Sequence, residues 1–121
     1  MTTTAEDSFL LQVGDVVWVD LSASRGREQG GVRPAVVLTD HGYHKRNDTA
    51  IVCPITSNKQ PWPTKVDLPE GLPVRGVILV DQIRVLDRPT RGFRAVGRVP
   101  EAVMEEVRAK LAALLGINRA S

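Results

Sequence analysis

The chain has 121 residues, of which 42% are hydrophobic and 25% charged, and its formal net charge at pH 7 is +2. This length suffices for one ordinary domain but not for two independent cores, and the apolar fraction excludes general disorder. Arginine supplies 12 of the 16 basic residues. This favours an anionic partner because a guanidinium group binds phosphate through two parallel hydrogen bonds, although an arginine-rich surface also follows from a GC-rich genome.

The single cysteine, Cys53, excludes an intramolecular disulfide and a cysteine-rich zinc site. It lies in the apolar run 50–53, where we expect a buried thiol. The N-terminus lacks a basic start and a long apolar stretch, and no apolar run is long enough to cross a bilayer. We therefore expect a cytoplasmic protein.

Short β-rich runs separated by turn-forming residues dominate the chain. Residues 1–12 are expected to form an N-terminal tail and residues 13–121 a single domain. Strands are predicted over 16–20, 34–39, 50–56, 64–68 and 93–99, with 76–80 and 83–86 expected to form one long bent strand. The pattern predicts a mainly β barrel or sandwich. Because Pro54 cannot donate to a ladder, its strand is expected to lie at an edge or to carry a bulge there.

The last segment has helical rather than strand periodicity. Apolar residues recur at spacings of four, four and three residues, after a proline suited to a first helical turn and before a glycine suited to a helix end. These are Val103, Val107, Leu111 and Leu114, flanked by Met104 and Leu115, between Pro100 and Gly116. We expect one amphipathic helix that covers the β core.

Asp40–Asp48 is predicted to be a polar loop that contains two histidines, His41 and His44. A metal site there would need a third ligand. The pair has the chemistry of an acid and a base, but solvated loop residues are the expected role.

Three other segments offer candidate site residues. A glycine-rich charged loop, 24–34, leads into a strand, and Arg33 precedes a proline, which favours extended backbone for it. A buried run ends in Thr56 and Ser57, followed by Asn58 and Lys59. If the two strand ends are neighbours, the hydroxyls and Arg33 converge on one phosphate. A third element is the polar pair at 81–82 in an apolar run.

These segments give the strings GDVVWVDL, EQGGVRPAVVL, VCPITS and GVILVDQIRVLD, followed by a proline-initiated helix. In this order they resemble the MazF/PemK family of toxin–antitoxin ribonucleases, from about Val13 to Ile117. The resemblance implies an SH3-like β-barrel with a C-terminal α-helix, of the MazF/PemK/CcdB type. It also implies a homodimer that cleaves single-stranded RNA without a metal or cofactor, and a cognate antitoxin as partner.

The resemblance assigns roles by position. Arg33 and Thr56 match the family's arginine and threonine, Glu28 its EQ glutamate, and Asp81 and Gln82 its DQ pair. The PemK/Kid branch has a histidine before the EQ pair and an arginine two residues before the DQ aspartate, whereas this chain has Arg27 and Leu79. The MazF-like arginine–threonine arrangement therefore fits better.

RNA is cut most simply without a metal through its own 2′-hydroxyl, so we expect Arg33 and Thr56 to hold the scissile phosphate with help from Ser57. Arginine rarely gives up its proton, which makes Glu28 the better base unless it only orients Arg33. Base contacts or phosphate contacts are expected from Arg25, Arg27, Gln29, Lys45, Arg46, Asn58, Lys59, Gln82 and Trp62. Trp62 either stacks on a base or packs against the barrel or a dimer partner.

Two alternatives remain. A non-catalytic toxin of the same fold would bind a protein target such as DNA gyrase, as CcdB toxins do, but it would have no need of Arg33, Thr56 and Glu28. A nucleic-acid-binding barrel without chemistry would bind RNA strongly and leave it intact.

Overall fold

A computed structural model describes residues 11–22, 31–58 and 60–118 of the chain. Its strands are β1 (Asp15–Asp20), β2 (Val32–Val37), β3 (Thr49–Thr56), β4 (Lys65–Asp67), β5 (Val77–Leu79), β6 (Arg84–Asp87) and β7 (Arg94–Arg98). Its helical elements are α2 (His41–Arg46), the 3-10 turn η1 (Val80–Gln82), α3 (Arg88–Arg91) and α4 (Glu101–Leu115). The strands pair in the order β4-β5-β3-β2-β1-β7, and β6 also pairs with β3. All the pairs are antiparallel.

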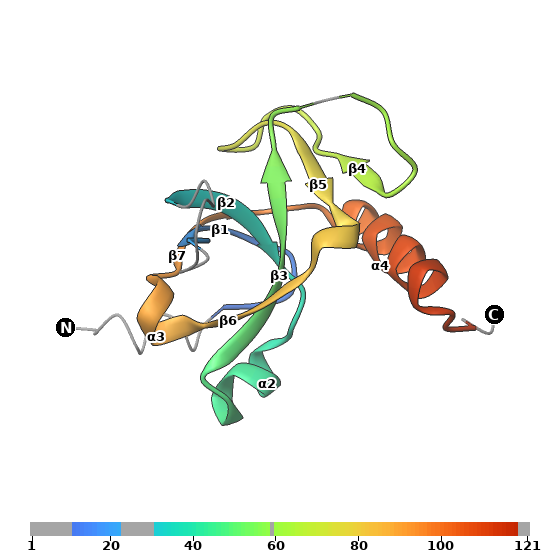
Figure 1. The fold of residues 1–121 in the computed structure, drawn as a ribbon. Helices are drawn as coiled ribbons and strands as arrows, with labels where there is room; N and C mark the ends of the chain where they lie inside the picture. Colours follow the sequence, from blue (N-terminus) through green and yellow to red (C-terminus); the bar gives the residue numbers. More distant parts are fainter. Residues whose placement is uncertain (1–10, 23–30, 59, 119–121) are drawn as a thin grey trace.

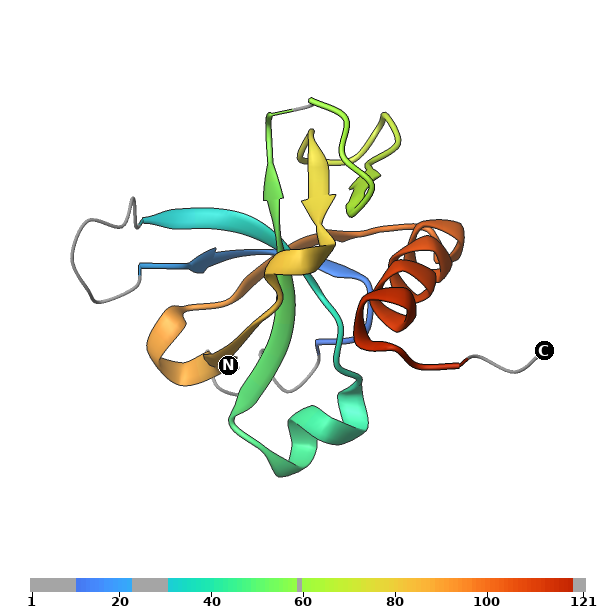
Figure 2. The ribbon, with the colours of Figure 1, turned by 45° about the vertical axis from the view of Figure 1, so that its right-hand side comes forward.

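The predicted fold class, mainly antiparallel β with a C-terminal helix, is confirmed (Figure 1). The sheet bends sharply, and α4 packs on one side of it while α2 lies at the opposite end of β3 from the β4–β5 region (Figures 1 and 2). Within the described ranges, no helix is long and apolar enough to cross a membrane.

β3 organises the molecule because it pairs with three strands. One edge faces β2. The other edge pairs first with β6, over residues 49–52, and then with β5, over residues 55–56. The expectation of one long bent strand over 76–86 is wrong, because η1 separates β5 from β6. Each of these two strands pairs with only one part of β3. The turn is held by a hydrogen bond from the Val80 N–H to the Thr64 carbonyl (3.1 Å).

The change of partner also accommodates Pro54, which lies in an internal strand rather than at a sheet edge. The Ile51 N–H points toward the β2 side, where it donates to Thr39 Oγ1 (3.2 Å). Because backbone groups alternate along a strand, the Pro54 nitrogen faces the other side. There the β6 ladder has ended and the β5 ladder has not begun. The missing N–H therefore costs no sheet hydrogen bond.

Both faces of the sheet are buried in valine-rich clusters. One cluster includes Val16 and Val36, is covered by Met104 and Val107 of α4, and contains Cys53 as expected. The other lies on the opposite face and includes Val17, Val19, Ala35, Val37, Val52 and Leu86. The consecutive residues Val16 and Val17 of β1 belong to opposite clusters, because successive side chains of a strand point to opposite faces of the sheet.

α4 follows the prediction at its C-terminus and departs from it elsewhere. Gly116 ends the helix with φ +72°, a left-handed conformation that favours glycine. Pro100 precedes the helix as its N-cap rather than occupying the first turn. The predicted apolar stripe is buried only in part, because Leu114 and Leu115 remain 47% and 61% exposed.

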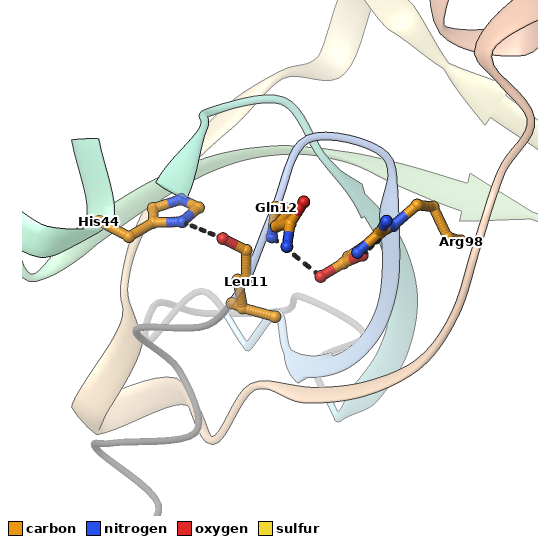
Figure 3. Close-up of polar contacts among 5 residues, drawn as sticks. Leu11, Gln12, His44 and Arg98 are labelled. Atoms are coloured by element: carbon orange, nitrogen blue, oxygen red, sulfur yellow. Dashed lines mark hydrogen bonds and ion pairs between the residues drawn. The ribbon is translucent and has the colours of Figure 1, made fainter. Parts of the chain in front are cut away.

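The predicted loop over 40–48 is wrong, because residues 41–46 form the helix α2. Asp40 caps it by accepting a hydrogen bond from the Tyr43 N–H (2.9 Å). His44 is fully buried rather than solvated. Its Nδ1–H donates to the Leu11 carbonyl (2.9 Å), as Figure 3 shows. Its Nε2 accepts from the Thr39 hydroxyl (2.7 Å). Both bonds suit a neutral imidazole, and burial lowers the pKa of His44.

Candidate active site

Arg33 lies in the second position of β2, where it is exposed and stands opposite Val19 of β1. Two hydrogen bonds close the base of the β1–β2 connection: the Leu21 N–H donates to the Gly31 carbonyl (3.1 Å), and the Gly31 N–H donates to Ser22 Oγ (3.0 Å). Arg84 of β6 adds a bond to the Leu21 carbonyl (2.9 Å). The strand end that carries Arg33 is thus fixed from two sides.

Thr56 ends β3, and the pairing of β2 with β3 brings it to Arg33. Ala35 of β2 is the register partner of Pro54. Continuing this antiparallel register two residues toward the strand ends places Arg33 across from Thr56, on the same sheet face. The ends of β2 and β3 are therefore neighbours, as the expected convergence of Arg33 and the hydroxyls on one phosphate requires.

The Thr56 hydroxyl has a fixed environment. Its Oγ1 accepts a hydrogen bond from the Asn58 N–H (3.2 Å), so its own hydrogen points elsewhere. The backbone of Thr56 is in close contact with Gly76, since a Cβ built on Gly76 would lie 2.2 Å from the Thr56 carbonyl oxygen.

A cavity of about 690 Å³ brings the predicted residues together, and we call it the phosphate cleft. Four of its polar lining residues were predicted, namely Arg33, Thr56, Ser57 and Gln82. Two more, Arg75 and Arg84, were not. In the sequence, Arg75 is marked only by its place next to Gly76, and Arg84 only by its place two residues after Gln82. A single arginine forms no motif that would identify a site residue. The cleft thus combines guanidinium groups and hydroxyls, the donors that an anionic phosphate requires.

A second pocket of about 340 Å³ adjoins the phosphate cleft, with Leu79 and Gln82 lining both. We call it the tryptophan pocket; its polar and aromatic lining includes Asn58, Gln60, Trp62, Lys65, Asp81 and Gln82. Trp62 is 62% exposed, so it is not packed into its own barrel. Stacking on a base and packing against a dimer partner both stay predictions. The candidate residues therefore divide between two adjacent pockets.

Five candidates lie outside the described residues: Arg25, Arg27, Glu28, Gln29 and Lys59. Their assignments, including Glu28 as base, stay predictions.

The histidines do not contribute to either pocket. His44 is the buried residue of α2. The side chain of Arg88, which is also buried, donates to the His44 carbonyl (2.7 Å). His41 begins α2 on the exposed surface. In the part of the chain that the structure describes, no three residues of the His, Cys, Asp and Glu types cluster as metal ligands do.

Comparison with known proteins places this architecture in a family. The family model described as PemK-like, MazF-like toxin of type II toxin-antitoxin system matches residues 12–115. The endoribonuclease toxin MazF of Escherichia coli K12 is 32% identical over 108 residues, which cover 89% of this chain and 96% of that protein.

Two solved structures from Deinococcus radiodurans are similar as well. MazF in crystal form I has a TM-score of 0.81 and 39% identity, with coverage of 88% of this chain and 97% of that one. A chain of the MazE–MazF form II structure has a TM-score of 0.83 and 38% identity, with coverage of 90% and 98%.

The antiparallel sheet with a C-terminal helix is the fold that this chain shares with these MazF structures. The chain belongs to the PemK/MazF family of toxins of type II toxin–antitoxin systems. It is a homologue of the endoribonuclease MazF over most of its length. The family, the fold and the class of enzyme predicted from the sequence are confirmed.

Proposed function

We propose that this toxin is a metal-independent endoribonuclease that cleaves single-stranded RNA at short sequences. The observation that supports the proposal most directly is the phosphate cleft, in which Arg33, Thr56 and Ser57 line one cavity. A guanidinium fork beside two hydroxyls suits the phosphate of an RNA backbone better than it suits an apolar protein segment.

In the proposed reaction the 2′-oxygen of RNA attacks the adjacent phosphorus and the 5′-oxygen leaves. The products carry a 2′,3′-cyclic phosphate and a 5′-hydroxyl. Arg33 and Thr56 hold the scissile phosphate, stabilise charge on its non-bridging oxygens and orient the attack in line, with Ser57 as a further donor.

Two protons must move during the reaction. Glu28 accepts the proton of the 2′-hydroxyl, and Arg33 donates to the leaving oxygen or stabilises its charge. The DQ pair, Asp81 and Gln82, supports the site from the edge of the cleft. A Glu28→Gln variant with full activity would remove the base role.

The RNA is bound as an unstacked single strand, because proteins read RNA bases mainly where they are not paired. Asn58, Gln29 and Gln82 contact base edges, and Trp62 stacks on a base. The salt-dependent contacts to the backbone come from Arg25, Arg27 and Lys59.

We further propose that the toxin acts as a homodimer and is neutralised by a cognate antitoxin. A MazE–MazF structure is known for Deinococcus radiodurans. In this chain, large apolar side chains are exposed on the sheet at Val32 and Val85 and at the end of α4 at Leu115 and Ile117. Such surface suits protein partners. An acidic and apolar antitoxin segment would also compete with RNA for the cationic cleft.

Purified protein, freed of antitoxin, should be incubated with a long single-stranded RNA in EDTA. Discrete fragments ending in 2′,3′-cyclic phosphate are expected. Arg33→Ala and Thr56→Ala should each lower the rate by about 10²–10³-fold, the usual cost of one transition-state donor. Arg46, one of the residues expected to contact the RNA backbone, lies instead on α2 at the end of β3 opposite Thr56. Arg46→Ala therefore serves as the matched control and should cleave normally.

Intact RNA from a folded wild-type dimer would refute the proposal. Tight binding without cleavage would then support a nucleic-acid-binding barrel, and the lack of both would support a toxin that acts on a protein target.

A further inference from the structure

The tryptophan pocket lies directly beside the phosphate cleft, and this position suggests what it binds. Because Leu79 and Gln82 line both cavities, an RNA strand whose phosphate lies between Arg33 and Thr56 has its neighbouring nucleotide at the second pocket. The volume of about 340 Å³ is at the small end of the range for ligand sites. It suits one nucleotide base rather than a folded partner.

The loop that forms one wall is held by lysine side chains. Lys65 Nζ donates to the carbonyls of Asn58 (3.1 Å) and Gln60 (2.8 Å). Lys110 of α4 donates to the Pro63 carbonyl (2.7 Å). A further bond runs from the Gln60 N–H to Asn58 Oδ1 (3.0 Å). The pocket is thus formed before RNA binds, and the lysine that lines it is engaged with backbone carbonyls.

Asp81 gives the pocket its chemical preference. It is exposed and lines this pocket, and among the described residues no ion pair includes it. An ionised carboxylate only accepts hydrogen bonds and repels phosphate, so a base that binds against it must present an N–H group. Adenine, cytosine and guanine each have an amino group for this purpose. Uracil has one N–H between two carbonyl oxygens, and those oxygens would face the carboxylate.

We propose that the tryptophan pocket binds one RNA base beside the scissile phosphate, stacked on Trp62, and that Asp81 selects bases with an amino group against uracil. This inference rests on the proposed ribonuclease function and adds to it the residue that discriminates at one position of the cleaved sequence.

Cleavage of a randomised RNA library tests the selection. When the sequences around each cut are determined, uracil should be depleted at one position next to the cleaved bond by at least about fivefold, the scale of one good base contact. Asp81→Asn should remove that depletion, because an amide both donates and accepts. Glu70→Gln, which removes a carboxylate on an exposed loop, should leave it unchanged. Unaltered depletion in Asp81→Asn, with normal product ends, would overturn the inference while the proposed function stands.

Binding measurements test the selection against uracil even if a variant no longer cleaves RNA. Oligocytidine and oligouridine of equal length with 2′-O-methyl groups cannot be cut, because they lack the attacking hydroxyl. Wild type should bind oligocytidine more tightly by about fivefold or more, and Asp81→Asn should bind both equally. Trp62→Ala should weaken both by roughly 5- to 150-fold.

If wild type and Trp62→Ala bind oligocytidine and oligouridine all with the same affinity, the inference is overturned and the pocket is left to a protein partner. Wild type that binds as expected but cleaves no RNA would instead contradict the proposed function.

Discussion

Gly76 offers a way to displace Thr56 without changing any group that contacts RNA. Its φ is +132°, and a Cβ there would lie 2.2 Å from the carbonyl oxygen and 2.9 Å from the carbonyl carbon of Thr56. Carbon and oxygen in contact are normally separated by about 3.3 Å, so a Gly76→Ala substitution pushes the end of β3 by about 1 Å. A misplacement of that size in a catalytic group costs about 100-fold in rate.

A matched control separates this displacement from backbone strain. Gly71 has φ +94°, and a Cβ there would meet nothing within 4 Å. Gly71→Ala therefore carries the penalty of a left-handed conformation, roughly 1–2 kcal/mol, without the clash. The assay is kcat on a short fluorogenic RNA, together with the thermal unfolding midpoint of each variant. Gly76→Ala should lose about 100-fold in kcat and Gly71→Ala should keep wild-type kcat. Wild-type kcat in Gly76→Ala at a stability equal to that of Gly71→Ala would refute the reasoning.

Three further outcomes follow from buried or cationic groups. Burial lowers the pKa of His44, so the folded state binds its proton less readily than the unfolded state. The stabilisation from neutral His44 is complete above its unfolded pKa of about 6.5 and is lost as the pH falls through the lower folded pKa. His44→Asn should flatten the drop in melting temperature between about pH 7 and about pH 5, and His41→Asn should not. Burial raises the pKa of Cys53 to about 12, so iodoacetamide should modify this thiol only in unfolded protein; rapid modification of the native state would contradict its burial. Arg75→Gln should lower the slope of log affinity against log salt by about 0.7 for single-stranded RNA, whereas Arg46→Gln, on α2, should not change it.

The strands β1, β2 and β3 and the helix α4 could be predicted from the sequence, because residues close together in the chain determine each of them. Valine-rich runs between turn residues define β1, β2 and β3, and the four-residue spacing of apolar side chains defines α4. The helix end at Gly116 was also predictable, since a left-handed residue there favours glycine. Arg33 and Thr56 were identified as candidates for the same reason, as polar residues at the ends of apolar strands.

Features that depend on partners distant in the sequence were missed. The division of the 76–86 run into β5, η1 and β6 depends on how β3 bends, and no local signal encodes that bend. α2 is only six residues long, too short for a clear period, although Asp40 was a visible capping residue. Arg75 and Arg84 join the cleft only because β5 and β6 both pair with β3.

The closure of the β1–β2 connection has an evolutionary consequence. Both ends of the connection are fixed by bonds among residues 20–22, Gly31, Arg84 and Arg91. Lengthening a loop between fixed ends costs little, about 0.6 kcal/mol for each doubling. Insertions between these two ends therefore cost little in stability. Descendants of this toxin can therefore differ in the length of this connection while the strand end that carries Arg33 stays in place.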